Sequence, residues 1–262
     1  MEQNLQTQQR VGKQKKVELR IEPLPFRVRE AINVLRGNIQ MSGYQLKAIA
    51  VTSALKHEGK SSTAFRLAKS LANLNKKTLY LDCDIRNSTT LTRYDVQGKT
   101  VGLSEFLCGR AGIHDVIYKT DDEYMDVLFA GAVAPNPSEL FSGSLFQKLL
   151  EYLKLKYEYV IVDTPPVNPV IDGVLIARQC DGTILVVEGG VTERAQVIHA
   201  KQQLEYANVK ILGVVLNKVG GAKASRYGYG YGKYGYGYGN YGYGEESDQD
   251  SRNKEPKETS KE

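Results

Sequence analysis

Ala50-Val-Thr-Ser-Ala-Leu-Lys-His-Glu-Gly-Lys-Ser-Ser-Thr63 is the stretch from which the architecture of this chain can be worked out. An apolar run leads into Gly59-Lys60-Ser61, and a segment with helical character begins at Thr63. A strand that ends in such a loop before a helix directs backbone N–H groups and the positive end of the helix dipole towards an anion. Lys60 is expected to reach the β- and γ-phosphates of a nucleotide, and the Ser61 hydroxyl to bind Mg²⁺. The stretch therefore predicts a site for a nucleoside triphosphate.

The phosphate-loop pattern G-x-x-x-x-G-K-[ST] is incomplete here, because Ala54 stands where the first glycine belongs. By itself, Gly-Lys-Ser is equally compatible with an ordinary turn. Two acidic motifs favour the nucleotide site, Thr78-Leu-Tyr-Leu-Asp-Cys-Asp-Ile-Arg86 and Val160-Ile-Val-Asp-Thr-Pro-Pro166. Asp82 and Asp84 lie two residues apart, on the same side of an extended chain, and Asp163 ends the second apolar run. Each motif alone also fits a strand followed by a polar turn, but ligands of parallel α/β sheets collect where strands end.

Apolar, β-branched segments alternate with helical ones along most of the chain. This order predicts an α/β fold with a mostly parallel, twisted sheet and helices on both faces. Strands are expected at 47–53, 78–82, 125–129, 158–163, 183–188 and 210–216, and helices at 27–39, 61–75, 103–108, 138–156, 171–178 and 193–206. Ser138 is expected to cap the helix over 138–156, and the polar stretch 110–123 to be a surface connection.

Composition divides the 262 residues into three parts. Residues 1–22 are expected to form a flexible basic arm, 23–221 the folded domain and 222–262 a disordered tail. The arm is interpreted as a solvated leader, with attraction to anionic lipid or to an acidic partner as the alternative. The net charge of +5 is spread too evenly to predict nucleic-acid binding, and no apolar run is long enough to span a bilayer. Three widely spaced cysteines favour a reducing, cytoplasmic environment.

Tyr-Gly repeats fill residues 227–244 of the tail, which hold eight tyrosines and eight glycines. Alternating glycine disfavours a stable helix or strand. A linker, a β-aggregating segment and a stacking platform for nucleic acid are alternatives, but the only basic residue among the repeats is Lys233. We favour an array of phosphate acceptors, because each phosphotyrosine adds roughly −1.5 to −2 charge and several would make the tail anionic. The predicted acceptors are Tyr227, Tyr229, Tyr231, Tyr234, Tyr236, Tyr238, Tyr241 and Tyr243.

Together, these motifs resemble those of the bacterial tyrosine kinases of capsular and exopolysaccharide export systems, in particular the separate cytoplasmic kinase subunits of Gram-positive bacteria. The resemblance runs from about residue 23 to the end and includes Pro135-Asn-Pro-Ser-Glu-Leu140. Partition-type ATPases share the nucleotide motifs, so the specific feature is the combination of these motifs with the tail. The resemblance implies a P-loop NTPase fold and an ATP- and Mg²⁺-dependent protein-tyrosine kinase. Such a kinase is expected to phosphorylate the tail of a neighbouring copy.

A phosphate cradle and a metal site are implied at the three strand ends. Asp163 is expected to hold Mg²⁺ directly or through water, and Asp84 and Ser61 to supply further oxygen ligands. The nucleotide is expected to contact Glu58, Gly59, Lys60, Ser61, Ser62 and Thr63.

Three further residues are given roles in the reaction. Asp82 is expected to take the proton of the incoming tyrosine hydroxyl, although spacing leaves Asp82 and Asp84 interchangeable. Arg86 is expected to steady these carboxylates or the phosphate. Asn217 resembles the adenine-reading position of the family, with a simple turn residue as the alternative.

The resemblance also implies partners. A membrane-embedded chain-length regulator would activate the kinase and recruit it to the inner face of the membrane, and a phosphotyrosine phosphatase would reverse its action. Family members form rings through an E-x-x-R-x-x-R helix, and here Glu30 and Arg36 match while Asn33 replaces the middle arginine. Lys56 replaces a proline of the phosphate loop. Leu55 replaces a lysine that partition and cell-division ATPases carry.

Two alternatives of other classes remain open at this point. One is a partition-type or cell-division-type ATPase switch that passes phosphate only to water. The other is an ATP-binding scaffold of the polysaccharide machinery without kinase activity. Leu55 argues against the first, because the characteristic lysine of that class is missing.

Overall fold

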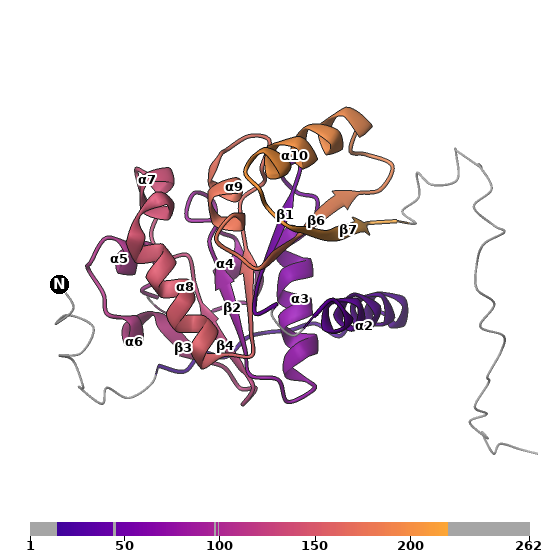
Figure 1. Cartoon of the computed structure of the whole chain (residues 1–262). Coiled ribbons are helices and arrows are strands. Elements are labelled where there is room, and N and C mark those ends of the chain that lie inside the picture. The colour runs from indigo at the N-terminus through magenta and orange to yellow at the C-terminus, as the bar shows by residue number, and fades with distance from the viewer. Residues whose placement is uncertain (1–14, 44–45, 97, 99, 220–262) are drawn as a thin grey trace, which may run out of the picture. The chain divides into compact units, whose positions relative to one another are not determined.

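The computed structural model describes residues 15–43, 46–96, 98 and 100–219. A seven-stranded sheet runs through this part of the chain in the order β3-β4-β2-β5-β1-β6-β7 (Figure 1). Its strands are β1 (Ala48–Ser53), β2 (Thr78–Asp82), β3 (Ile117–Lys119), β4 (Met125–Leu128), β5 (Tyr159–Asp163), β6 (Gly182–Glu188) and β7 (Ile211–Asn217). All neighbours pair in parallel except β3, which is antiparallel to β4. The predicted fold class is confirmed, and every predicted strand lies within one residue of its expected bounds.

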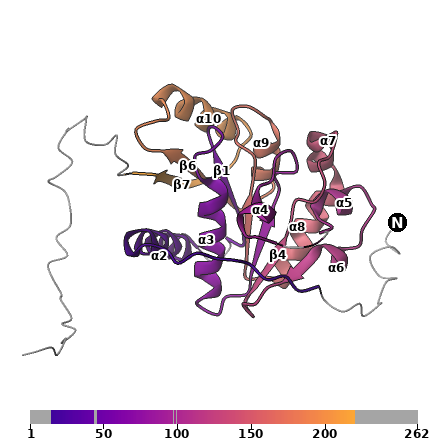
Figure 2. The ribbon, with the colours of Figure 1, turned by 180° about the vertical axis from the view of Figure 1, so that it is seen from behind.

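Helices cover both faces of the sheet, as the views from opposite sides show (Figures 1 and 2). One face carries α2 (Phe26–Met41), α3 (Lys60–Ala72) and the short α4 (Thr90–Arg93). The other carries α5 (Leu103–Leu107), α6 (Ile113–Val116), α7 (Pro137–Ser142), α8 (Ser144–Lys156), α9 (Asp172–Ala177) and α10 (Arg194–Tyr206). None of the helices in the described ranges combines the length and the hydropathy that crossing a bilayer requires.

Residues of the central strands alternate between the two faces, as a buried parallel sheet requires. Ile49 and Val51 of β1 pack under α3, whereas Ala48 and Ala50 face the opposite helices. In β2 the same alternation puts Tyr80 on the α3 face, and Asp82, two residues later, shares its side. Asp82 lies in register with Asp163 at the end of β5. The strand pairing therefore brings two carboxylates to adjacent positions beside the start of α3.

The prediction of a surface connection at 110–123 is wrong. This stretch contains α6 and β3, and Val116, Ile117 and Tyr118 are buried. The Tyr118 hydroxyl donates to the carbonyl oxygen of Val101 and accepts from its backbone N–H. Polar residues on either side concealed this short apolar run, whose burial depends on contacts distant in sequence.

The single helix predicted over 138–156 is interrupted at Gly143, whose backbone is extended with φ −73° and ψ 152°. Ser138 does not cap it, because α7 begins at Pro137 and the Ser138 hydroxyl donates to Asp172 at 2.6 Å. The side chain was therefore assigned to the wrong partner. Its acceptor lies in α9, which sequence spacing could not indicate.

The flexible arm predicted over residues 1–22 is wrong for residues 15–20. The backbone N–H of Val17 donates to the carbonyl of Lys119 at 2.8 Å, so the arm lies along the β3 edge. The N–H of Arg20 donates to Tyr94 at 3.0 Å. Val17 and Leu19 are buried in the core on the α3 face. Residues 1–14 and the predicted tail, including all eight acceptor tyrosines, lie outside the described residues.

Replacing Leu19 with alanine tests this packing. Leu19 is 8% exposed, and removing a buried leucine side chain is expected to lower the free energy of unfolding by about 2 kcal/mol. Urea unfolding followed by circular dichroism measures the change. Leu155→Ala is the matched control, because Leu155 is 86% exposed and its loss should change stability by less than about 0.5 kcal/mol. Equal unfolding midpoints for the two variants would contradict the docking of the arm.

Candidate functional site

The loop between β1 and α3 is held in place by groups from strands distant in sequence. Glu58 is buried, and its carboxylate accepts from the backbone N–H groups of Leu55 at 2.6 Å and Glu188 at 3.3 Å, and from the Thr192 hydroxyl. The Asn217 side-chain amide donates to the carbonyl of Glu58 at 2.9 Å. These contacts attach the loop to the ends of β6 and β7.

Gly59 supplies the turn into α3. Its φ of +93° is left-handed, and a Cβ at this position would lie 2.0 Å from the Asn217 amide nitrogen. Only glycine combines that backbone angle with so close an approach. Lys60 then begins the helix, so its backbone and those of the next residues present free N–H groups at the helix N-terminus.

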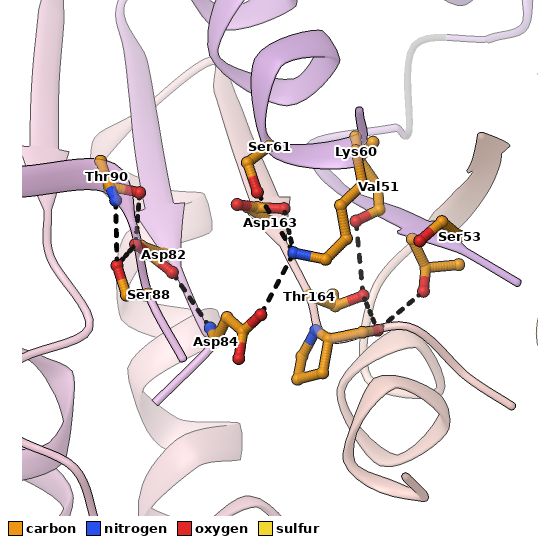
Figure 3. Close-up of polar contacts among 12 residues, drawn as sticks. Val51, Ser53, Lys60, Ser61, Asp82, Asp84, Ser88, Thr90, Asp163 and Thr164 are labelled. Carbon is orange, nitrogen blue, oxygen red and sulfur yellow. Dashed lines mark hydrogen bonds and ion pairs between the residues drawn. The ribbon is translucent and has the colours of Figure 1, made fainter. Parts of the chain in front are cut away.

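Lys60 lies between two carboxylates (Figure 3). Its Nζ is 3.2 Å from Asp84 Oδ2 and 3.6 Å from Asp163 Oδ1, and it donates to the Ser61 hydroxyl at 3.1 Å. Burial alone would lower the pKa of Lys60, but the charges of Asp163 and Asp84 outweigh it and raise this pKa above the ordinary value. Lys60 therefore stays cationic in the site.

Asp163 has one satisfied and one unsatisfied oxygen. Its Oδ2 accepts from the Tyr80 hydroxyl at 2.9 Å, whereas Oδ1 is buried and accepts no hydrogen bond from the described residues. Burial raises the pKa of this carboxyl, and the charge of Lys60 and the hydroxyls of Ser61 and Tyr80 oppose that effect. An oxygen in this state, beside a cation and a hydroxyl, suits a metal-bound water or a metal ion.

Asp82 is enclosed by donors. Its Oδ2 accepts from the hydroxyls of Ser88 and Thr90, each at 2.5 Å, and Oδ1 accepts from the Asp84 backbone at 3.0 Å. Burial, followed by the charge of Asp163, raises the pKa of Asp82 to about 6. A carboxyl with that pKa can gain and release a proton near neutral pH.

Asp84 is more accessible than its neighbour, with 9% of the residue exposed against 1% for Asp82. One of its oxygens meets Lys60 and the other accepts from the Asn87 backbone at 3.1 Å. Among the described residues, no three His, Cys, Asp or Glu side chains form a ready-made metal cage. Mg²⁺ in nucleotide sites takes one or two carboxylates and completes its shell with phosphate and water, and Asp84 and Asp163 are the carboxylates that could bind it here.

A cavity of 330 Å³ connects these groups. The predicted residues that line it are Gly59, Lys60, Ser61, Ser62, Asp82, Asp84 and Asp163. Sequence reasoning missed other lining residues, among them Ser88, Thr90, Arg93 and Lys218. The polar run Asn87-Ser-Thr-Thr90, directly after the acidic motif, could have indicated the hydroxyls of Ser88 and Thr90.

Four of the residues predicted for catalysis or nucleotide binding do not line this cavity, namely Glu58, Thr63, Arg86 and Asn217. Arg86 instead forms an ion pair with the fully buried Asp172, whose other oxygen accepts from Ser138. Arg86 thus fastens the acidic motif to α7 and α9. Asn217 is likewise engaged with the loop backbone.

The predicted ring residues lie on α2, away from the cavity. Arg36 donates to the backbone oxygen of Ser70 at 3.1 Å and to its hydroxyl at 2.8 Å, which fastens α2 to α3 within the chain. Glu30 is exposed and accepts from Asn33 at 3.0 Å.

Comparisons with known proteins agree with this geometry. The AAA domain family model matches residues 46–188. The tyrosine-protein kinase CpsD of Streptococcus agalactiae is 42% identical over 205 residues, which is 78% of this chain and 90% of that protein. The tyrosine-protein kinase YwqD of Bacillus subtilis is 35% identical over 202 residues, covering 76% of this chain and 85% of that one.

A solved structure is similar over a comparable length. The kinase domain of the Escherichia coli tyrosine kinase ETK superposes with a TM-score of 0.71 at 31% identity, covering 85% of this chain and 89% of that domain.

Tyr80→Phe tests the support of Asp163. Removing the phenol hydroxyl leaves Asp163 Oδ2 without its donor, and loss of a group that orients a metal-binding side chain typically weakens metal binding at least about tenfold. We expect the Mg²⁺ concentration for half-maximal nucleotide binding to rise by about that factor, measured by calorimetry with ADP. Tyr206→Phe is the control, because Tyr206 is exposed on α10. An unchanged Mg²⁺ requirement in Tyr80→Phe would show that the hydroxyl does not orient Asp163.

Proposed function

Because this chain belongs to the bacterial tyrosine-protein kinases of capsular and exopolysaccharide systems, we propose that it phosphorylates the tyrosine cluster 227–243 of a neighbouring copy with ATP. The cluster is the acceptor that the chain itself carries. A tail of about 40 residues can extend on the order of 100 Å, at roughly 3.3 Å per residue, so it reaches a second molecule easily. Tethering within an assembly raises the effective acceptor concentration to the millimolar range.

The observation that carries this proposal is the position of Lys60 between Asp84 and Asp163 at the start of α3. Phosphoryl transfer requires groups that position the reactants and neutralise the charge on the transferred group. The helix N-terminus, the Lys60 ammonium and the Ser61 hydroxyl converge on one cavity. Together they suit the β- and γ-phosphates of ATP.

Asp163, Asp84 and Ser61 are the residues that would hold Mg²⁺. When bound, the ion supplies positive charge to the phosphate oxygens. Asp163 Oδ1 accepts no hydrogen bond from the described residues and lies 3.6 Å from the Lys60 ammonium, so it would accept a metal-bound water or the ion itself. Tyr80 holds the other oxygen of this carboxylate in place. Lys60 limits the repulsion between Asp84 and Asp163.

Asp82 is proposed as the base. The tyrosine oxygen bonds to the γ-phosphorus, the bond from that phosphorus to the β–γ bridging oxygen breaks, and ADP leaves. The phenol proton passes to the Asp82 carboxylate, whose pKa of about 6 leaves it ionised at neutral pH. Asp84 stays the alternative base, since it is the more accessible carboxylate.

The nucleotide base and the partners belong to the same proposal. Asn217 lies beside the loop at the end of β7 and would read adenine from there. A membrane-embedded chain-length regulator would activate the kinase at the inner face of the membrane, and a phosphotyrosine phosphatase would reset it. Arg36 is engaged with α3, so Glu30 is the predicted ring residue that remains available for a contact between copies.

Lys60→Met tests the catalytic role. Without the ammonium group, phosphorylation of residues 227–243 is expected to fall at least about a thousandfold, measured by mass spectrometry after incubation with ATP, Mg²⁺ and an activating regulator segment. Lys76→Met is the control, because the Lys76 side chain is partly exposed, pairs with Glu158 and does not line the cavity.

Two outcomes would contradict the proposal. One is tail phosphorylation that persists in Lys60→Met. The other is ATP hydrolysis by the wild-type chain without any phosphotyrosine, which would favour an ATPase switch.

The pH dependence of the reaction tests the base. A base must be ionised, so the wild-type rate is expected to rise with pH through about 6, the raised pKa of Asp82. Asp82→Asn should lose this rise of the rate with pH together with most of the activity, whereas Asp84→Asn should keep the rise. If the rise with pH is lost only in Asp84→Asn, Asp84 is the base instead of Asp82.

A further inference from the structure

Arg93 lines the cavity and contacts the first turn of α3, directly after the phosphate loop. It is the last residue of α4 and lines the same cavity as Lys60 and Asp82. Its guanidinium Nη1 donates to the hydroxyl of Ser62, in the first turn of α3. Arg93 therefore bridges the two helices that border the phosphate site.

The backbone around Arg93 is fixed on both sides. Thr90 donates its hydroxyl to Asp82, and residues three apart on a helix share a face, so Thr90 and Arg93 face the cavity together. Tyr94, the next residue, is buried and stacks on Phe65 with ring centroids 3.8 Å apart. These contacts fix where the Arg93 side chain starts, while the residue itself is exposed to solvent.

Charge balance separates Arg93 from two other cations of the cavity, Lys60 and Lys218. Lys60 is neutralised by Asp84 and Asp163. Lys218 is paired with Glu188 at 2.8 Å and donates to the His57 carbonyl.

By contrast, no ion pair between described residues involves Arg93 or Lys56. The partner of Arg93 is a neutral hydroxyl, which it can exchange for an anion at small cost. A triphosphate remains anionic even with Mg²⁺ bound, so it is the natural partner for this unpaired charge.

The chemistry of the guanidinium suits the reacting end of the nucleotide. Its planar fork can donate two parallel hydrogen bonds to phosphoryl oxygens, which an ammonium cannot do. α4 also holds Asp82, the proposed acceptor of the tyrosine proton, through Thr90. Arg86, the nearest other arginine of this segment, is occupied by Asp172 and does not line the cavity.

We propose that Arg93 is a catalytic residue that leaves Ser62 and contacts the γ-phosphoryl oxygens as their charge spreads during transfer. This inference rests on the proposed phosphoryl transfer. The β–γ bridging P–O bond breaks and the bond from phosphorus to the acceptor oxygen forms, while Arg93 only donates hydrogen bonds and keeps its protons. Its stabilisation applies chiefly to the transition state, as for arginines supplied to other phosphoryl-transfer sites from within the same chain.

Binding of a transition-state mimic by the full-length protein tests this inference without an acceptor. The probes are MgADP alone and MgADP with aluminium fluoride, measured by calorimetry for wild type, Arg93→Gln and Arg93→Lys. In Arg93→Gln, affinity for MgADP should change by less than about threefold, whereas affinity for the aluminium fluoride complex should fall about a hundredfold. The affinity of Arg93→Lys for the aluminium fluoride complex should lie between those of wild type and Arg93→Gln, since lysine keeps the charge but cannot donate two parallel hydrogen bonds.

Arg110→Gln is the matched control, because Arg110 is exposed and does not line the cavity. Equal losses for both probes would make Arg93 a ground-state phosphate contact and overturn the inference, as would no loss for either. In kinetic assays Arg93→Gln should lower kcat roughly 100- to 1,000-fold with little change in the KM for ATP. A rise confined to the KM of a tail peptide would assign Arg93 to acceptor binding instead and overturn it.

The two proposals fail separately. If binding of the aluminium fluoride complex depends on Arg93 but wild-type protein phosphorylates no tyrosine, the role of Arg93 is supported and the proposed phosphorylation of the tail is wrong. If the tail is phosphorylated at equal rates in Arg93→Gln and wild type, the kinase activity is supported and the catalytic role of Arg93 is wrong.

Discussion

The ion pairs of Lys60 with Asp163 and Asp84 are the interaction on which this site depends. Strand pairing puts Asp82 and Asp163 in register, both almost inaccessible to water, and Asp84 follows two residues later. Buried carboxylates of like charge repel one another and lose hydration, so they persist only with a cation and with donors nearby. Lys60 provides that cation, and hydroxyls from Tyr80, Ser88 and Thr90 provide the donors.

A second set of contacts holds the two segments that carry these charged groups. Glu58 and Asn217 hold the phosphate loop to the ends of β6 and β7, so contacts within the chain fix its conformation. Arg86 and Asp172 do the equivalent for the acidic motif, which they attach to α7 and α9. Preorganised charge of this kind lowers the reorganisation needed during phosphoryl transfer.

Errors in the sequence-based expectations have a common physical origin. The segment with Ile117 and Tyr118 and the arm with Val17 and Leu19 are short apolar runs inside polar surroundings, and each is buried only because another part of the chain lies beside it. Ser138 also has a partner that is distant in sequence, since its hydroxyl donates to Asp172 in α9 and does not cap the nearby helix. Local patterns indicate how a segment could fold, whereas contacts distant in sequence select its partner.

From the sequence alone came the parallel α/β architecture, the phosphate loop at Gly59–Ser61 and the acidic ends of the strands, because apolar periodicity and short motifs are local properties of the chain. The Tyr-Gly cluster was also visible there. Tertiary structure alone decided that Asp82 and Asp163 become adjacent, that Arg86 pairs with Asp172, and that Arg93 lines the cavity without an acidic partner among the described residues. These outcomes depend on strand order and helix packing, because both bring together residues that lie far apart in the sequence.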